Sequence, residues 1–113
     1  MAGTPKTFGP VALTATLTTN IYNQTSALIY ETVKSILVTN KTAGAVTFTI
    51  YKGLTGANTA GTELFVAVSV PANTTSVFYP SGLVLKSTDF LVGGASALTS
   101  LVFTMNTEQV VVP

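Results

Sequence analysis

Alternation of apolar with hydroxyl-bearing residues constrains the fold of this chain more than any other feature of its sequence. The clearest case is residues 46–51, where three apolar side chains alternate with three that carry hydroxyl groups. The apolar members are Val46, Phe48 and Ile50, and the hydroxyl-bearing members are Thr47, Thr49 and Tyr51. Because successive side chains of a strand point to opposite faces, this pattern predicts a strand with one buried face and one outward face.

The same segment is predicted to be the second strand of a β-hairpin that spans residues 32–52. The first run is equally strand-like, and the intervening residues 40–44 contain the Asn, Thr and Gly that tight connections use. Three consecutive apolar residues, Ile36, Leu37 and Val38, favour a central strand that is contacted on both faces. We therefore expect a central pair of strands here.

Similar short runs recur along the chain, separated by turn signals about every 8 to 12 residues, and no segment shows a helical period. The sequence thus predicts an all-β fold, a single antiparallel β-sandwich (jelly-roll or immunoglobulin-like) of about eight or nine short strands. Residues 1–10 contain two Pro and two Gly and are predicted to form an extended N-terminal arm, with the sandwich domain over residues 11–113. Gly93-Gly94 is expected to break a strand, and Asn106-Thr107 to turn the chain between two strands.

The residue types present exclude most common catalytic chemistry. The chain has no Cys and no His, so thiol nucleophiles, disulfides, imidazole bases and the usual zinc ligands are all missing. Its four acidic residues, Glu31, Glu63, Asp89 and Glu108, fall in separate segments, where we expect exposed charges at strand ends rather than a catalytic pair. We expect no enzyme activity, no cofactor and no metal site.

Charge and hydropathy point to an assembling protein. The net charge is +1, with five Lys and no Arg, so nucleic acid is not an expected partner. Charged residues make up 8% of the chain, whereas small soluble domains usually carry about 25 to 35% on their surface. No apolar run approaches the ~18 residues of a spanning helix, and the N-terminus lacks the apolar region of a signal peptide, so we expect no membrane partner.

Other short motifs have ordinary explanations. Lys34-Ser35 and Lys86-Ser87 place a lysine beside a serine, but adjacent strand residues point to opposite faces and cannot form a local nucleophile pair. The glycine-rich residues 53–62 lack the Lys-Ser/Thr of a phosphate-binding loop and are predicted to form a connection. Asn-x-Ser/Thr triplets begin at residues 23, 40 and 73 in predicted turns, where Asn and Thr are favoured without glycosylation.

Five phrases of the sequence resemble small structural proteins of tailed bacteriophages. They are KSILVTNKT at residues 34–42, AVTFTI at 45–50, AGTELF at 60–65, VPANTT at 70–75 and GLVLKSTDF at 82–90. The resemblance covers about residues 28–112 and lies in the order of the phrases. It implies a β-sandwich component of the virion, either a head decoration (cement) protein or a module of neck, tail or fibre proteins. This family has no catalytic residues to carry over.

The resemblance further implies a protein that binds and stabilises the outer capsid shell, assembled in the host cytoplasm and located in the virion. Its expected partners are the major capsid protein and copies of itself, as a homo-oligomer such as a trimer. Candidate assembly contacts are Lys6 and Phe8 in the arm, the outward row Thr47, Thr49 and Tyr51, and Leu54 in the glycine-rich connection. A neck, tail or fibre subunit is the first alternative. A carbohydrate-binding adhesin that uses residues 53–62 is the second, although the chain has no Trp or Arg to support it.

Overall fold

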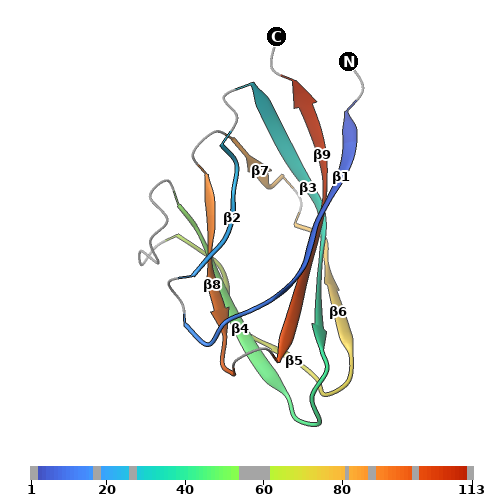
Figure 1. Ribbon diagram of the computed structural model, residues 1–113, viewed down its shortest axis with the longest axis vertical. Helices are drawn as coiled ribbons and strands as arrows, with labels where there is room; N and C mark the ends of the chain where they lie inside the picture. Colours follow the sequence, from blue (N-terminus) through green and yellow to red (C-terminus); the bar gives the residue numbers. More distant parts are fainter. Residues whose placement is uncertain are drawn as a thin grey trace.

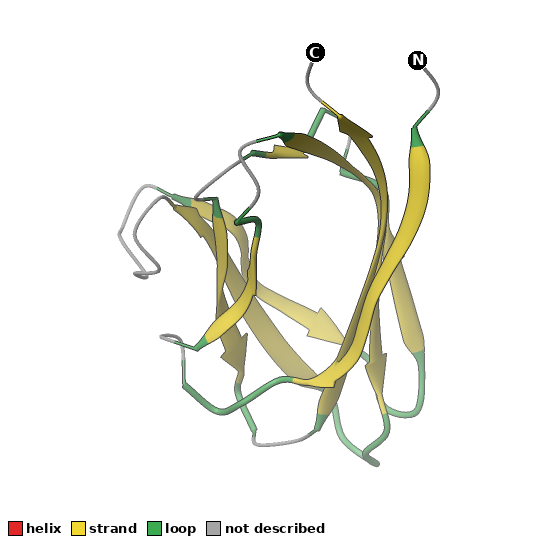
Figure 2. Cartoon of the chain, turned by 45° about the horizontal axis from the view of Figure 1, so that its top comes forward, coloured by secondary structure: helices red, strands yellow, loops and turns green. Residues whose placement is uncertain are grey.

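The computed structural model describes residues 3–16, 19–25, 28–53, 62–80, 82–86, 89–97 and 100–111. These residues contain nine β-strands and no helix (Figure 2). The strands are β1 (Thr4–Ala12), β2 (Asn20–Asn23), β3 (Ile29–Asn40), β4 (Val46–Gly53), β5 (Glu63–Val70), β6 (Thr75–Phe78), β7 (Val84–Leu85), β8 (Phe90–Ala95) and β9 (Leu101–Val111). The predicted all-β fold with about eight or nine strands is confirmed.

The strands form two antiparallel sheets that pack against each other as a β-sandwich (Figure 1). One sheet has the order β1-β9-β3-β6, and β7 pairs with β3 beside β6, nearer the start of β3. The other sheet has the order β2-β8-β4-β5. Both termini of the described chain lie at the same end of the molecule (Figure 1). The free edges of the sandwich are therefore β1 and β6 with β7 in one sheet, and β2 and β5 in the other.

The core lies between the two sheets and takes inward side chains from both. Phe48 of β4 is 1% exposed, and its ring centroid lies 5.4 Å from that of Phe65 and 5.7 Å from that of Phe78. Further fully buried members include Ile36, Val38, Ile50, Leu91, Leu101, Phe103 and Met105. The inward face predicted for residues 46–51 is correct, because Val46, Phe48 and Ile50 are buried and the three alternate residues are only partly covered.

The predicted hairpin over residues 32–52 is wrong, because β3 and β4 belong to different sheets. Asn40 explains why the connection crosses the sandwich. Its buried side chain donates from Nδ2 to the carbonyl oxygens of Gly44 (2.8 Å) and Val70 (2.9 Å). Its Oδ1 accepts hydrogen bonds from the amide and hydroxyl of Thr42. Asn, Thr and Gly are equally suited to this connection between sheets and to a tight hairpin turn, so composition alone could not distinguish the two structures.

Most of the predicted N-terminal arm is edge strand β1, and the boundary predicted at residue 10 falls inside this strand. β1 pairs with β9 from Thr4 to Ala12, with a register shift between Phe8 and Val11. Proline has no N–H group to donate to a neighbouring strand, so it is tolerated on an edge strand, which is paired on one side only. Gly9, at φ 95°, lies inside the shift, where a Cβ would come within 2.6 Å of the carbonyl oxygen of Phe103. Close pairing with β9 thus makes this segment part of the sandwich.

Two predicted strand breaks are also wrong. β8 continues through Gly93 and Gly94. Its backbone lies so close to the neighbouring strand that a Cβ at Gly93 would overlap the carbonyl oxygen of Thr49. The glycines here permit a close approach of backbones. β9 runs unbroken through Asn106 and Thr107. The Asn106 side chain forms hydrogen bonds with Thr7 and Ser35 of the two neighbouring strands, and Thr107 is buried in the interior.

Candidate functional site

The residues predicted as assembly contacts do not form one site. Thr47, Thr49 and Tyr51 follow one another on the outer face of β4. Lys6 is exposed on edge strand β1, in the opposite sheet. Phe8 is half-buried, with its ring centroid 4.9 Å from Tyr22 and 6.3 Å from Phe103, so it packs against the core. Leu54 lies outside the described residues.

The hydroxyls of the predicted row are partly used by the fold itself. Thr47 and Thr49 line a shallow hollow of about 270 Å³ together with Ala15, Gly94 and Ser96. The Thr49 hydroxyl accepts a hydrogen bond from the amide of Ala67 (3.0 Å), where β5 is irregular, and the Ser96 hydroxyl accepts one from the amide of Thr47 (3.1 Å). This surface is uncharged and small, and at least one of its hydroxyls has a structural role.

A buried carboxylate replaces the exposed charge that was predicted at Glu31. Glu31 is 2% exposed and is surrounded by four neutral donors. Its Oε1 accepts hydrogen bonds from the Tyr22 hydroxyl (2.5 Å) and Gln24 Nε2 (2.9 Å). Its Oε2 accepts them from the Thr107 hydroxyl (2.7 Å) and Gln109 Nε2 (3.1 Å). The cluster joins β2, β3 and β9 across the sandwich. A buried charge needs hydrogen-bond partners of this kind, so we interpret the cluster as structural.

This cluster changes the titration of Tyr22. Burial, followed by the hydrogen bond and negative charge of Glu31, raises the pKa of the phenol well above its usual value of 10.0. In the unfolded chain Tyr22 ionises near pH 10, whereas in the folded chain it keeps its proton at that pH. The stabilisation from this group is therefore fully present below about pH 10 and is lost as the pH rises further.

We expect Tyr22→Phe to abolish the part of the stability loss above about pH 10 that comes from ionisation of Tyr22. The variant should lose about 1 to 3 kcal/mol at neutral pH, because Glu31 then lacks one hydrogen bond. Urea midpoints of both proteins, measured between about pH 8 and 11, should fall more steeply for the wild type above about pH 10. Parallel curves would contradict the role assigned to Tyr22.

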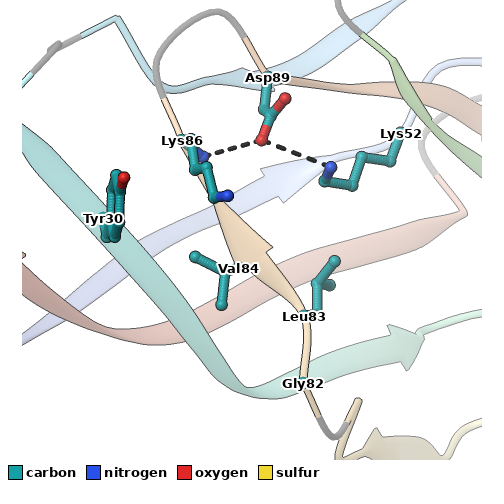
Figure 3. Close-up of a pocket in the computed structure, with 7 residues that line it drawn as sticks. All are labelled: Tyr30, Lys52, Gly82, Leu83, Val84, Lys86 and Asp89. Carbon is teal, nitrogen blue, oxygen red and sulfur yellow. Dashed lines mark hydrogen bonds and ion pairs between the residues drawn. The ribbon is translucent and has the colours of Figure 1, made fainter.

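A pocket of about 670 Å³ lies beside β7 (Figure 3). Its lining consists of Tyr30, Lys52, Gly82, Leu83, Val84, Lys86 and Asp89. Asp89 is almost fully buried, contrary to the prediction of an exposed charge, and Oδ2 accepts a hydrogen bond from the Lys86 amide (2.8 Å). The same oxygen lies 3.4 Å from Lys52 Nζ. We call this hollow the basic pocket.

The basic pocket carries a surplus of positive charge. Two of the five lysines of the chain line it, against one carboxylate that is already engaged by Lys52. Lys86 Nζ lies 5.4 Å from the centroid of the Tyr30 ring and forms no ion pair with any described residue. Tyr30 and Lys86 lie on one side of the pocket and Lys52 on the other (Figure 3). A cation over an aromatic ring stays available to an approaching anion.

Two further hollows adjoin the basic pocket. An apolar hollow of about 450 Å³ is lined by Leu64, Phe65, Pro80, Gly82 and Leu83, and shares the last two with the basic pocket. A smaller one, of about 260 Å³, is lined by Thr32, Val33, Lys34, Tyr79, Pro80 and Gly82. Since all three include Gly82, we call them together the Gly82 groove. The groove joins the first sheet, through β3 and β7, to edge strand β5 of the second.

Exposed apolar side chains gather on the edge strands next to this groove. On β5, Leu64 and Val66 are exposed, and on or just after β6, Val77 and Tyr79 are exposed. The apolar residues of β5 do not all share one face, because Ala67 has φ 45° and the pairing with β4 shifts between Val68 and Phe65. We call Leu64, Val66, Val77 and Tyr79 the apolar edge.

The outer face of the first sheet is polar but carries few charges. The Thr7 hydroxyl bonds to Asn106 Oδ1 (3.0 Å), and Asn106 Nδ2 donates to the Ser35 hydroxyl (3.0 Å). Thr39 and Thr75 are also bonded across β3 and β6 (2.9 Å). These hydroxyl and amide groups supply much of the polar character of this part of the face.

Sequence reasoning missed the basic pocket because its members come from β3, β4 and the chain around β7 and β8. A partial signal existed at Asp89, since Asp is favoured in turns, where its side chain can hydrogen-bond to nearby backbone. Among the described residues, no three acidic side chains converge in a way that could hold a metal ion. Nor does the described part of the chain contain a helix long and apolar enough to cross a membrane.

Comparison with known proteins gave no relative: no family model, no curated protein and no solved structure matches this chain.

Proposed function

We propose that this chain is a structural protein that acts by docking onto a larger assembly. The observation that carries the proposal is the apolar edge, four large apolar side chains exposed on neighbouring edge strands. Natural sandwiches usually protect edge strands with charges or proline, as Pro5, Lys6 and Pro10 do on β1. β5 has no lysine or proline and one charged residue, Glu63 at its start, and exposed apolar side chains that cluster at a surface mark interaction sites.

Within this class, we propose a bacteriophage head decoration protein that binds the outer capsid shell. The resemblance of five phrases of the sequence to small phage structural proteins supports this narrower assignment. The sparsely charged outer face of the first sheet also suits contacts repeated many times on a shell. Such a protein stabilises the particle because contacts made only in the assembled state shift the assembly equilibrium, and many weak contacts act together.

Electron microscopy of bacteriophage particles incubated with the purified, gold-labelled chain tests whether it is a head decoration protein. A decoration protein should label the whole head surface at high and regular density. Label confined to the neck, tail or fibres, at a low copy number, would favour the alternative structural role. Absence of label from every part of the particle would overturn the proposal.

A charge placed on the apolar edge should weaken docking. We expect Val66→Glu to reduce co-sedimentation with particles by about tenfold or more, because burying an unpaired carboxylate group costs at least about 1.4 kcal/mol. Leu28→Glu is the matched control, since Leu28 and Val66 are both 64% exposed and Leu28 lies outside the apolar edge. Equal binding of both variants, with circular dichroism spectra like that of the wild type, would remove the apolar edge from the interface.

A further inference from the structure

We propose that the Gly82 groove binds an extended, acidic segment of the partner protein, with a carboxylate side chain of that segment in the basic pocket. The neighbouring apolar hollow would take an apolar side chain of the same segment. This inference rests on the proposed function, because it names the chemistry of the partner that the docking surface recognises.

The charges of the basic pocket match one carboxylate. Lys52 and Lys86 together carry two positive charges, and Asp89 carries one negative charge, so one positive charge remains. Asp89 Oδ2 already holds the Lys52 ammonium at 3.4 Å and the Lys86 amide at 2.8 Å. The Lys86 ammonium, over the Tyr30 ring, is thus the group positioned to bind an incoming anion.

The apolar parts of the groove indicate that the anion belongs to a peptide. Leu83 lines both the basic pocket and the apolar hollow, so a ligand that enters one lies directly beside the other. Leu64 of the apolar hollow also belongs to the apolar edge, which continues along β5 to Val66. A chain of alternating acidic and apolar side chains can fill both hollows, and an unpaired edge strand is suited to bind it.

Phosphate-bearing ligands fit the groove less well. A doubly charged phosphate would exceed the single surplus positive charge and would approach the carboxylate of Asp89. Recognition of phosphate and nucleic acid relies strongly on arginine, which this chain lacks.

Titration of the full chain with short peptides, followed by amide chemical shifts in NMR, tests the inference. The probe is the blocked peptide Val-Glu-Val-Glu-Val, and its neutral counterpart has Gln in place of Glu. We expect saturable shifts at residues 82–86 and 64–65, with affinity about fivefold lower for the neutral peptide, the size of an exposed ion pair. Affinity for the acidic peptide should also fall as salt rises from about 0.05 to 0.5 M.

Lys86→Gln should lower the affinity for the acidic peptide about fivefold and leave the affinity for the neutral peptide unchanged. Lys41→Gln is the matched control, because Lys41 is exposed in the β3–β4 connection and lines none of the three hollows. Equal affinity for the two peptides, or an unchanged affinity of Lys86→Gln, would overturn the inference. So would inorganic phosphate that saturates the same shifts while the acidic peptide produces none.

The inference and the proposed function can fail separately. If the chain coats particles and Lys86→Gln coats them equally well, the groove is not the docking site and the structural role stands. If the acidic peptide binds in the groove but no particle is labelled, the groove is a peptide site and the virion role fails.

Discussion

Phe48→Ala is expected to lower the free energy of unfolding by about 3 to 5 kcal/mol. Phe48 is 1% exposed, and its ring meets Phe65 of its own sheet and Phe78 of the opposite sheet, which also contact each other at 5.3 Å between centroids. Removing the ring leaves a cavity between the two sheets that the rigid strands around it cannot fill. Domains of this size are stable by only about 5 to 15 kcal/mol, so the loss would be a large share of the total.

Urea denaturation followed by circular dichroism measures this loss. Tyr79→Ala is the control, because Tyr79 is an aromatic residue of similar size that lies 76% exposed, and its removal should change stability by at most about 0.5 kcal/mol. A change below about 1 kcal/mol for Phe48→Ala would show that the ring does not fill the core.

Gly93→Ala is expected to destabilise the protein by more than about 3 kcal/mol. The added methyl group would overlap the carbonyl oxygen of Thr49 and lie 3.0 Å from Cα of Ile50. Both groups belong to the backbone of β4, which is held between β8 and β5 and cannot move without disrupting two strand pairs. A side-chain rotation cannot relieve this clash.

Gly44→Ala provides the matched comparison, since the same methyl group at that position meets no atom within 4 Å. We expect its unfolding free energy to remain within about 0.5 kcal/mol of the wild type. If thermal and urea unfolding gave similar values for the two alanine variants, the close approach of β8 to β4 would be incorrect.

Local patterns in the sequence predicted most of the strands but not how they pair. The alternation around Phe48 identified the buried face of β4, because period two depends only on neighbouring residues. The partner of β4 depends on where the chain goes next. Asn40 makes the difference, since its hydrogen bond to Val70 requires a strand 30 residues away that no local pattern reveals.

The same limit applies to the glycines and to the functional residues. Gly93 looked like a strand breaker because its propensity is poor, yet contact with the neighbouring backbone requires a residue without Cβ. Glu31 looked exposed because its charge usually is, and its partners Thr107 and Gln109 come from the far end of the chain. The basic pocket was missed for the same reason, because Lys52 meets Asp89 only after the sheets have formed.

The position of β9 between β1 and β3 has a consequence for biosynthesis. Thr4–Ala12 and Ile29–Asn40 both pair with Leu101–Val111, and neither pairs with the other. During translation, β1 therefore has no strand to pair with, and one edge of β3 stays open, until β9 has emerged. Folding that waits for distant partners is slow and exposes chains to aggregation. A ribosome-bound chain that stops before residue 101 should consequently remain sensitive to protease within Thr4–Ala12.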